Sequence, residues 1–241
     1  YRGKFLDIGC FHPTRHNNTY KMYKNGWRGI NIDLNPLTID LFNFKRRKDI
    51  NINVAISNNE ENKTLYFVDE LNTQNTLEAN HLSFLKNHHN LKEEEISHQE
   101  IKTKKLDKIL DAYNFNDIDF MNIDVEGHEL NILNSIDFNK YRIKFICIEM
   151  IDHNDQAKLI NKKLNAILEK NNYVLEKKLD FNSIYKKIDM TKKINPDLTA
   201  EQKIVLFEDG TEVPGTSELN HEKREGSYHC TNCGEKLFDS T

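Results

Sequence analysis

Two short apolar segments near the start of the chain each run into an acidic residue. The first, Phe5–Ile8, contains Asp7 and precedes Gly9, and the second, Gly29–Ile32, precedes Asp33. A helical pattern lies between them, and parallel strands joined in this way direct their carboxyl ends into one crevice. There a glycine after the first strand lets the backbone approach a ligand, and an acid ending the second can bind both hydroxyls of a ribose. The sequence therefore predicts a site for a cofactor that contains adenosine.

The same alternation of strands and helices continues through most of the chain, and it predicts an α/β fold with a mostly parallel sheet. The expected strands are Phe5–Ile8, Gly29–Ile32, Ile50–Ile56, Leu65–Val68, Ile118–Ile123, Phe145–Met150, Tyr173–Leu175 and Ser183–Tyr185. Helical patterns lie between many of them, for example Thr19–Tyr23, Leu106–Tyr113, Glu129–Leu133 and Ala157–Leu168. The last two strands are joined by a short polar connection, which predicts an antiparallel hairpin.

The change in composition near residue 189 predicts two parts. Residues 1–188 form the α/β domain, 189–196 a linker, and 197–241 a small segment without the strand and helix alternation. Residues 70–104 are polar and interrupt the alternation inside the first part. A loop of this length is usually functional or disordered, so a lid over the substrate and a solvated insertion are both open.

Composition argues against several classes of partner. The net charge of -4 and the pI near 6.2 give no electrostatic reason to expect nucleic acid. No apolar run reaches the roughly 20 residues that a membrane span needs. Four cysteines are too few for a disulfide framework, which predicts a cytoplasmic protein. Oligomeric state leaves no sign in the sequence.

The glycine pattern distinguishes between adenosine cofactors. Dinucleotide-binding sheets use three spaced glycines to bring the backbone close to a pyrophosphate, but here Gly9 is followed by bulky residues. S-adenosylmethionine (SAM) has no phosphate and needs fewer glycines. It requires an acid near the first strand, a turn glycine, an acid for the ribose and an apolar slot for adenine. Four features match these roles in order: Asp7, Gly9, Asp33, and the pair Ala55 and Ile56.

Three segments, residues 7–13, 23–36 and 119–129, resemble the FkbM-type SAM-dependent methyltransferases. The resemblance covers about residues 4–187. It implies the class I methyltransferase fold, which is Rossmann-like, with seven strands and a reversed last hairpin. It also implies methyl transfer to a hydroxyl of a sugar, a polyketide or another small metabolite. By this resemblance Asp7 and Gly9 lie under the methionine moiety, Asn18 and Thr19 begin the first helix as caps or ligand contacts, and Asp33 holds the ribose.

The end of the fourth parallel strand is rich in acids and lies on the expected catalytic rim. Asp124, Glu126 and His128 could orient or deprotonate an alcohol, and Glu149 at the end of the next strand faces the same rim. For His128 a capping or surface position is the alternative. A divalent metal held by the three carboxylates is a further alternative, since hard cations prefer oxygen ligands.

The C-terminal segment contains Cys230 and Cys233 at the spacing that one tetrahedral zinc ion prefers. One such pair is half a site, so zinc is a candidate ligand at an incomplete centre. Residues 197–241 resemble the N-terminal third of a B-type methionine sulfoxide reductase. In that family a second cysteine pair completes the zinc site and a later cysteine is the nucleophile, and no cysteine follows Cys233 in this sequence. We therefore expect an inactive segment that comes from a shortened fusion or from two joined reading frames.

Two other functions remain open beside the methyltransferase. The first part could be a non-catalytic SAM-binding module, which would need Asp33 but not the rim residues. Alternatively the chain could be part of a methionine sulfoxide reductase fusion in which the first domain is incidental.

Overall fold

The computed structural model describes residues 2–67, 76–77, 92, 95–152, 154–188, 195–208 and 210–240. The chain divides into two compact units, Tyr1–Ile188 and Asp189–Thr241. Most of the polar region 70–104, for which a lid or an insertion was considered, lies outside the described residues. Within those residues no helix is both long enough and apolar enough to cross a membrane.

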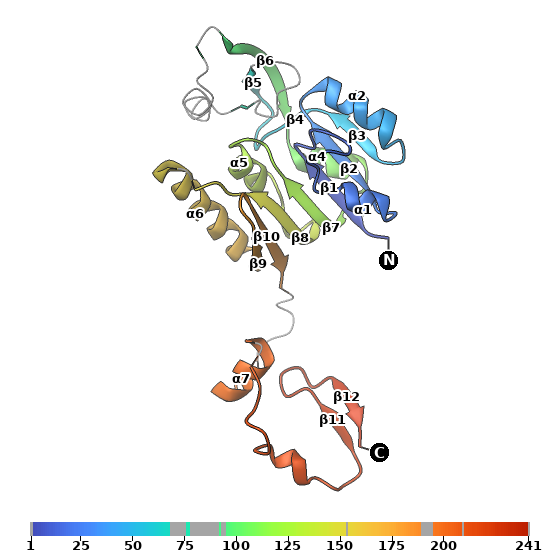
Figure 1. Ribbon diagram of the computed structural model, residues 1–241, viewed down its shortest axis with the longest axis vertical. Helices are drawn as coiled ribbons and strands as arrows, with labels where there is room; N and C mark the ends of the chain where they lie inside the picture. Colours follow the sequence, from blue (N-terminus) through green and yellow to red (C-terminus); the bar gives the residue numbers. More distant parts are fainter. Residues whose placement is uncertain are drawn as a thin grey trace. The chain divides into compact units, whose positions relative to one another are not determined.

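The first unit is built on a seven-stranded sheet with the order β3-β2-β1-β7-β8-β10-β9 (Figure 1). Every pairing is parallel except that β10 runs antiparallel to both β8 and β9. This confirms the predicted mostly parallel sheet with an antiparallel last hairpin. The strands are β1 (Lys4–Ile8), β2 (Arg28–Asp33), β3 (Ile50–Asn53), β7 (Asp117–Ile123), β8 (Arg142–Glu149), β9 (Tyr173–Lys178) and β10 (Asn182–Lys187).

Helices connect these strands and cover both faces of the sheet. They are α1 (Tyr20–Lys24), α2 (Pro36–Lys45), α4 (Leu106–Ala112), α5 (Glu129–Asn134) and α6 (Asp155–Lys170). The helices named from the sequence did not include α2, although its start carries ordinary signals. Asn35 accepts a hydrogen bond from the Leu37 amide as the N-cap, and Pro36 occupies the first turn, where its missing amide hydrogen costs nothing.

A smaller sheet of three strands, in the order β4-β6-β5, lies beside the main one (Figure 1). It consists of β4 (Ala55–Ile56), β5 (Asn62–Phe67) and β6 (Ser97–Lys104). The single strand predicted at Ile50–Ile56 is therefore wrong, because the chain leaves the main sheet at Val54 and pairs with β6 instead. The prediction also missed β6, since its sequence is almost entirely polar.

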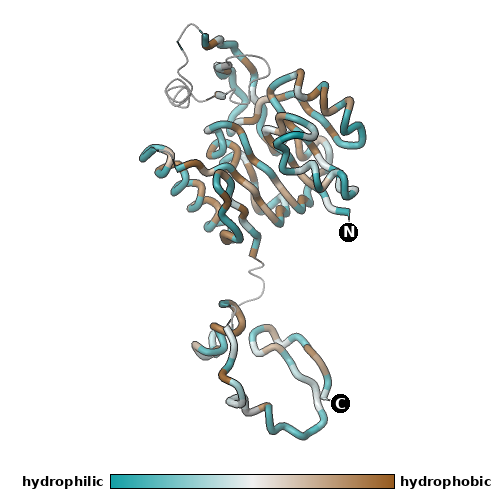
Figure 2. The backbone as a smooth tube through the Cα atoms, in the orientation of Figure 1, coloured by the Kyte–Doolittle hydropathy of each residue, from teal (hydrophilic) through white to brown (hydrophobic). Residues whose placement is uncertain are grey.

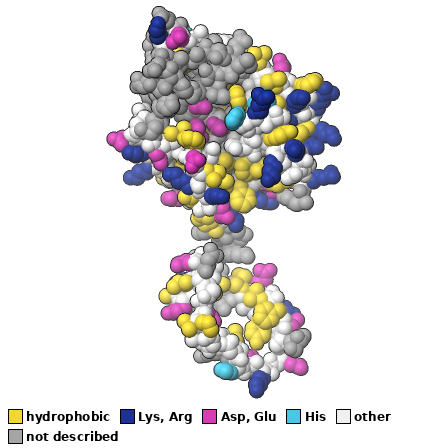
Figure 3. All heavy atoms as spheres, viewed as in Figure 1, with side chains coloured by type: hydrophobic (Ala, Val, Ile, Leu, Met, Phe, Trp, Pro, Cys, Tyr) yellow, Lys and Arg dark blue, Asp and Glu magenta, His cyan; other side chains and the backbone are white. Residues whose placement is uncertain are grey.

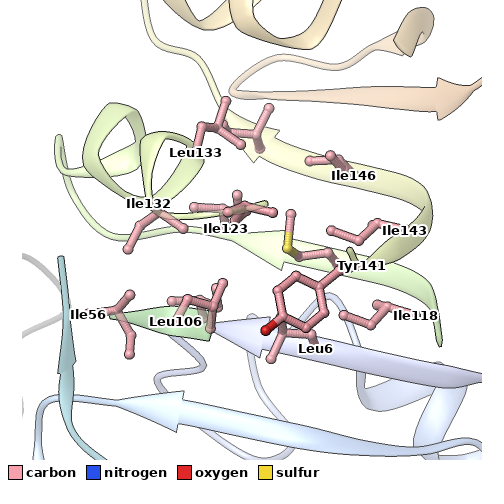
Figure 4. Packing of buried hydrophobic residues seen from close by; sticks show 14 of the residues in the cluster. Leu6, Ile56, Leu106, Ile118, Ile123, Ile132, Leu133, Tyr141, Ile143 and Ile146 are labelled. Carbon is pink, nitrogen blue, oxygen red and sulfur yellow. The ribbon is translucent and has the colours of Figure 1, made fainter. Parts of the chain in front are cut away.

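Alternating side chains of the central strands divide between two faces. On one face Leu6 and Ile8 of β1 belong to a large apolar cluster that includes side chains of α4, α5 and α6. Figure 4 shows part of this cluster, with Ile132 and Leu133 of α5 near Ile123 of β7. Figure 2 shows hydrophobic residues concentrated along these strands.

The other face of the sheet has a smaller apolar cluster beneath α2, made by Cys10, Ile39 and Phe42. It also carries polar side chains. In the strand register Asp7 of β1 pairs with Asn31 of β2 on one side and Asn122 of β7 on the other.

The second unit contains α7 (Ala200–Phe207), a short 3-10 helix (Glu218–His221), and the hairpin β11 (Ser227–His229) and β12 (Lys236–Asp239). Thr199 and Gln202 form a capping box at the start of α7. Among its described residues Leu198 is the one buried hydrophobic side chain.

Candidate cofactor and catalytic site

Two neighbouring cavities lie at the carboxyl ends of the central parallel strands. The first encloses about 680 Å³, including open space at its mouth, and the second about 600 Å³. Gly9, Phe11, Asp124 and Glu126 line both cavities. Their position is the one expected of a ligand site in an open α/β sheet.

Asp33 at the end of β2 lines the first cavity. Its Oδ2 accepts a hydrogen bond from the Phe11 amide and its Oδ1 one from the Asn35 amide, each at 2.9 Å. A carboxylate offers about four acceptor positions, so these two donors orient the group and leave room for the two hydroxyls of a ribose. Burial raises the pKa of Asp33 to about 6, so the acid is mainly ionised at neutral pH.

Ala55 and Ile56 of β4 lie on the wall of the same cavity. Each side chain is buried, and Ile32 and Val54 extend the apolar surface beside them. This is the place that the sequence assigned to adenine, and the structure brings it next to Asp33.

Gly9 has a structural requirement of its own. Its φ is +76°, a conformation that side chains disfavour, and a Cβ built there would collide with the carbonyl oxygen of Asp124. The Gly9 amide donates to the Ile32 carbonyl at 2.9 Å, and the Asp124 amide donates to the Ile8 carbonyl at 3.0 Å. The glycine therefore allows the ends of β1 and β7 to approach each other closely, in addition to lining the cavities.

Asp7 lines the second cavity. It is fully buried, and its Oδ2 accepts hydrogen bonds from Thr19 Oγ1 at 2.7 Å and Asn17 Nδ2 at 3.0 Å. Its Oδ1 accepts one from Asn122 Nδ2 at 3.0 Å. Burial raises the pKa of Asp7, and these donors work against that rise. Asp7 thus lines the second cavity and also holds the segment between β1 and α1 through Thr19 and Asn17.

Thr19 and Asn18 occupy different environments. Thr19 is at the N-cap position of α1, but the expected cap is wrong because its side chain makes no cap hydrogen bond and bonds Asp7 instead. It is also fully buried, which removes it from contact with a ligand. Asn18 lines the second cavity and donates to Asn122 Oδ1 at 2.9 Å. Of the two, Asn18 is the one in position to touch a ligand.

Besides Asp7, three carboxylates line the second cavity: Asp124 after β7, Glu126 in the following turn, and Glu149 at the end of β8. Burial is the main cause that raises the pKa of Asp124, and the charge of Glu126 adds to it. Burial likewise raises the pKa of Glu149, with Asp124 as the next contributor. Like charges close together in a partly dry site resist simultaneous ionisation. This arrangement can bind or exchange a proton near neutral pH.

Hydrogen bonds from Thr76 and to Glu129 stabilise the turn that carries Glu126. Glu126 has a φ of +53°, and its carbonyl accepts a hydrogen bond from Thr76 Oγ1 at 2.7 Å. Glu129 is buried in the first turn of α5, and its Oε1 accepts from the Val125 and Gly127 amides at 3.2 Å each. Glu129 is therefore a structural group, as expected of a residue inside the helix.

His128 occupies the N-cap position of α5, as one alternative expected, but its side chain makes no cap hydrogen bond and does not lie on the surface. It lines the first cavity but is only 1% exposed. Its Nδ1 lies 2.9 Å from Asn131 Nδ2, which can only donate, and its Nε2 lies 3.2 Å from Ser57 Oγ. A neutral ring that accepts at Nδ1 donates at Nε2, so both nitrogens have partners. His128 is poorly placed to act as a base in this arrangement.

Neither the carboxylates of the second cavity nor the cysteine pair forms a complete metal centre among the described residues. In the described ranges no group of three or more His, Cys, Asp or Glu side chains is arranged to hold a metal ion. Cys230 and Cys233 lie between β11 and β12, where the Gly234 amide donates to the Cys230 carbonyl at 2.8 Å. Structural zinc takes four protein ligands, so these two thiols supply half of a site.

Sequence reasoning missed several side chains around the cavities. Phe11 was considered only as an obstacle to a pyrophosphate, and Asn17, Arg46 and Asn122 were assigned no role. The isolated Asn in the apolar strand β7 was a usable signal, because a polar residue there must have a partner. Arg46 stands in the basic run from Lys45 to Lys48, which contains nothing to distinguish one buried arginine.

Comparison with known proteins divides the chain in the same way. Residues 198–241 match the model of the SelR domain. A segment of 43 residues is 54% identical to the peptide methionine sulfoxide reductase MsrB of Cellvibrio japonicus (strain Ueda107), covering 18% of this chain and 31% of that protein. The same reductase of Leifsonia xyli subsp. xyli (strain CTCB07) is 52% identical over 44 residues, covering 18% and 32%. The chain thus spans about a third of the length of these curated relatives.

The first unit matches a different group. The crystal structure of methyltransferase FkbM from Methylobacillus flagellatus KT aligns with a TM-score of 0.46 and 16% identity, covering 77% of this chain and 43% of that one. The model of the methyltransferase FkbM domain matches residues 7–175, which is more than half of the chain. The chain therefore belongs to the FkbM methyltransferase family and carries an MsrB-like segment at its C-terminus.

Proposed function

We propose that the first unit is a SAM-dependent methyltransferase that methylates a hydroxyl of a small metabolite or sugar. The observation that carries the proposal is the pair of cavities that share Gly9, Phe11, Asp124 and Glu126. One cavity combines an apolar wall with the oriented carboxylate of Asp33, which suits adenosine. The other is lined by carboxylates, which suit the cationic end of SAM and an acceptor that must lose a proton.

Bound SAM would supply an electrophilic methyl group for an in-line displacement. The chain has to hold the acceptor oxygen in line with that methyl group and remove its proton. Asp124, Glu126 and Glu149 line the second cavity. Burial raises the pKa of Asp124 to about 7, which suits a general base at neutral pH, and that of Glu149 to about 9, so Glu149 keeps its proton there and can orient the acceptor oxygen. Both ring nitrogens of His128 already have hydrogen-bond partners, so a carboxylate is the better candidate for removing the proton.

Calorimetric titration of the full chain with S-adenosylhomocysteine tests the cofactor, with NAD as the control ligand. We expect saturable binding of S-adenosylhomocysteine and none of NAD. Asp33→Ala should weaken binding by about 1.5–3 kcal/mol, the usual contribution of hydrogen bonds to a charged group. Asp40→Ala, an exposed acid on α2, is the matched control and should leave affinity unchanged. A folded wild-type protein that binds neither ligand would refute the proposal.

The acceptor class requires a separate assay. SAM and the protein are incubated with a panel of sugars and hydroxylated metabolites, and each product is examined by mass spectrometry for one added methyl group. Methylation confined to amines or thiols would contradict the hydroxyl assignment while leaving the cofactor assignment intact.

A further inference from the structure

The loop between β1 and α1 (residues 9–19, the β1–α1 loop) shapes both cavities. Phe11 lines the two cavities, and His16, Asn17 and Asn18 line the second. The Phe11 amide also orients Asp33 through its hydrogen bond to Oδ2. Any displacement of this loop would therefore change the adenosine side and the carboxylate side together.

This loop adopts a conformation that it would not keep by itself. Phe11 and His16 have φ values of +49° and +45°, in the left-handed region that residues with a Cβ disfavour. Such residues persist where surrounding contacts hold them, and they concentrate at functional sites.

Arg46, at the C-terminal end of α2, makes several of the contacts that hold the β1–α1 loop. Its Nε donates to the Pro13 carbonyl at 2.9 Å and its Nη1 to Thr19 Oγ1 at 2.8 Å, and its Nη2 donates to Asn17 Oδ1. The guanidinium thus bonds three residues of the loop. It is also packed among four aromatic rings, at 4.9–5.9 Å from their centres: Phe5, Tyr20, Tyr23 and Phe42.

The same loop residues connect Arg46 to a buried acid. Thr19 and Asn17, which accept from Arg46, donate to Asp7. Asp7 in turn lies between Asn31 and Asn122 in the register of the central strands. A buried cation and a buried anion therefore hold the loop from two sides. The planar guanidinium suits this position, since it can donate in several fixed directions at once, which an ammonium group cannot.

Arg46 differs from the basic residues around it. Figure 3 shows Lys and Arg side chains gathered on the side of the unit that carries α1 and α2. Lys45, Arg47 and Lys48 are exposed, whereas Arg46 is fully buried. A completely desolvated arginine within an otherwise solvated run of charges needs a specific reason.

We propose that Arg46 is a positioning residue for the cofactor site. It holds the β1–α1 loop in the conformation that forms the two cavities, although it lines neither of them. The inference rests on the proposed function for the identity of the ligand. The contacts of Arg46 with the loop do not depend on that identity.

The first test compares Arg46→Lys with Arg47→Lys in the full chain. Arg46→Lys keeps the positive charge but removes the planar guanidinium with its several donors. Arg47→Lys makes the same change at the exposed neighbour. Binding of S-adenosylhomocysteine is measured by calorimetry at a temperature where circular dichroism shows both variants folded. We expect about tenfold or greater weakening for Arg46→Lys and none for Arg47→Lys, because the exposed neighbour donates to the Phe44 carbonyl within α2 instead. Equal affinities for the two variants would overturn the proposal.

Hydrogen exchange of the ligand-free proteins separates positioning from general stability. In Arg46→Lys the amides of residues 9–19 should exchange faster while those of β7 and β8 stay protected. Faster exchange throughout the unit would show a structural role only and would overturn the inference. If Arg46→Lys does not fold, Thr19→Val takes its place. It removes the hydroxyl that links Arg46 to Asp7, and it should also weaken binding and loosen the loop. Wild-type protein that fails to bind S-adenosylhomocysteine would refute the proposed function, whereas the exchange result would still decide the role of Arg46.

Discussion

The close approach of β1 and β7 at Gly9 makes a prediction that can be worked out from the structure. In Gly9→Ala two costs combine. An alanine at φ +76° pays about 1–2 kcal/mol for the left-handed conformation. The new Cβ also meets the Asp124 carbonyl, and forcing an extra carbon into a packed region costs about 1–3 kcal/mol more. The expected loss of unfolding free energy is therefore about 2–5 kcal/mol.

Gly26→Ala is the matched control, because this glycine also has a positive φ, of +90°, but a Cβ there would make only ordinary van der Waals contacts. The nearest atoms to a Cβ at Gly26 belong to the flexible Arg2 side chain, at 3.8 Å and beyond. This variant should lose only the conformational part, about 1–2 kcal/mol. Urea denaturation followed by circular dichroism gives both free energies, and the melting temperature of Gly9→Ala should fall by on the order of 10 °C.

The difference between the two variants tests the argument. If Gly9→Ala and Gly26→Ala lose the same free energy within error, the ends of β1 and β7 are not in tight contact, and Gly9 is not needed for their approach. A larger loss at Gly9 that is accompanied by weaker binding of S-adenosylhomocysteine would tie the strand contact to the site.

Three further predictions concern charge and metal. Binding of S-adenosylhomocysteine should weaken as the pH falls through about 6, because Asp33 then gains a proton and loses an acceptor for the ribose; calorimetry at several pH values checks this, and a flat profile would contradict the role. Asp124→Asn should leave stability nearly unchanged at pH 4 and raise it at pH 8 by about 1–3 kcal/mol. The sign follows because burial raises the folded pKa of Asp124, so the wild type loses stability as the pH rises and the acid is forced to ionise. Thermal melts at both pH values measure the effect, with the exposed Asp180→Asn as control, and a destabilised Asp124→Asn at pH 8 would refute it. Zinc should bind Cys230 and Cys233 only weakly and below one equivalent, and tight one-to-one binding in a chelator competition would show that further ligands complete the site.

Much of the framework could be predicted from local sequence. Apolar runs of strand length, such as Phe5–Ile8 and Ile118–Ile123, became strands of the main sheet because burial of their side chains favours the interior. The last hairpin followed from its short polar connection. The prediction failed at β6, whose polar residues pair through the backbone and bury little surface. It also failed at Val54, where the chain changes sheets without any break in the apolar pattern.

The sequence by itself determined which residues end the central strands, and therefore which acids could face the crevice, since strand ends follow from local hydrophobicity. Only the tertiary structure decided which of those groups line the cavities and which hold other residues in place. Asp7 and Asn122 are 115 positions apart, and the strand register makes them hydrogen-bond partners. Arg46 is likewise buried because α2 carries it over the β1–α1 loop, although its neighbours in sequence remain in water. These roles depend on contacts between distant segments, and local sequence patterns do not record such contacts.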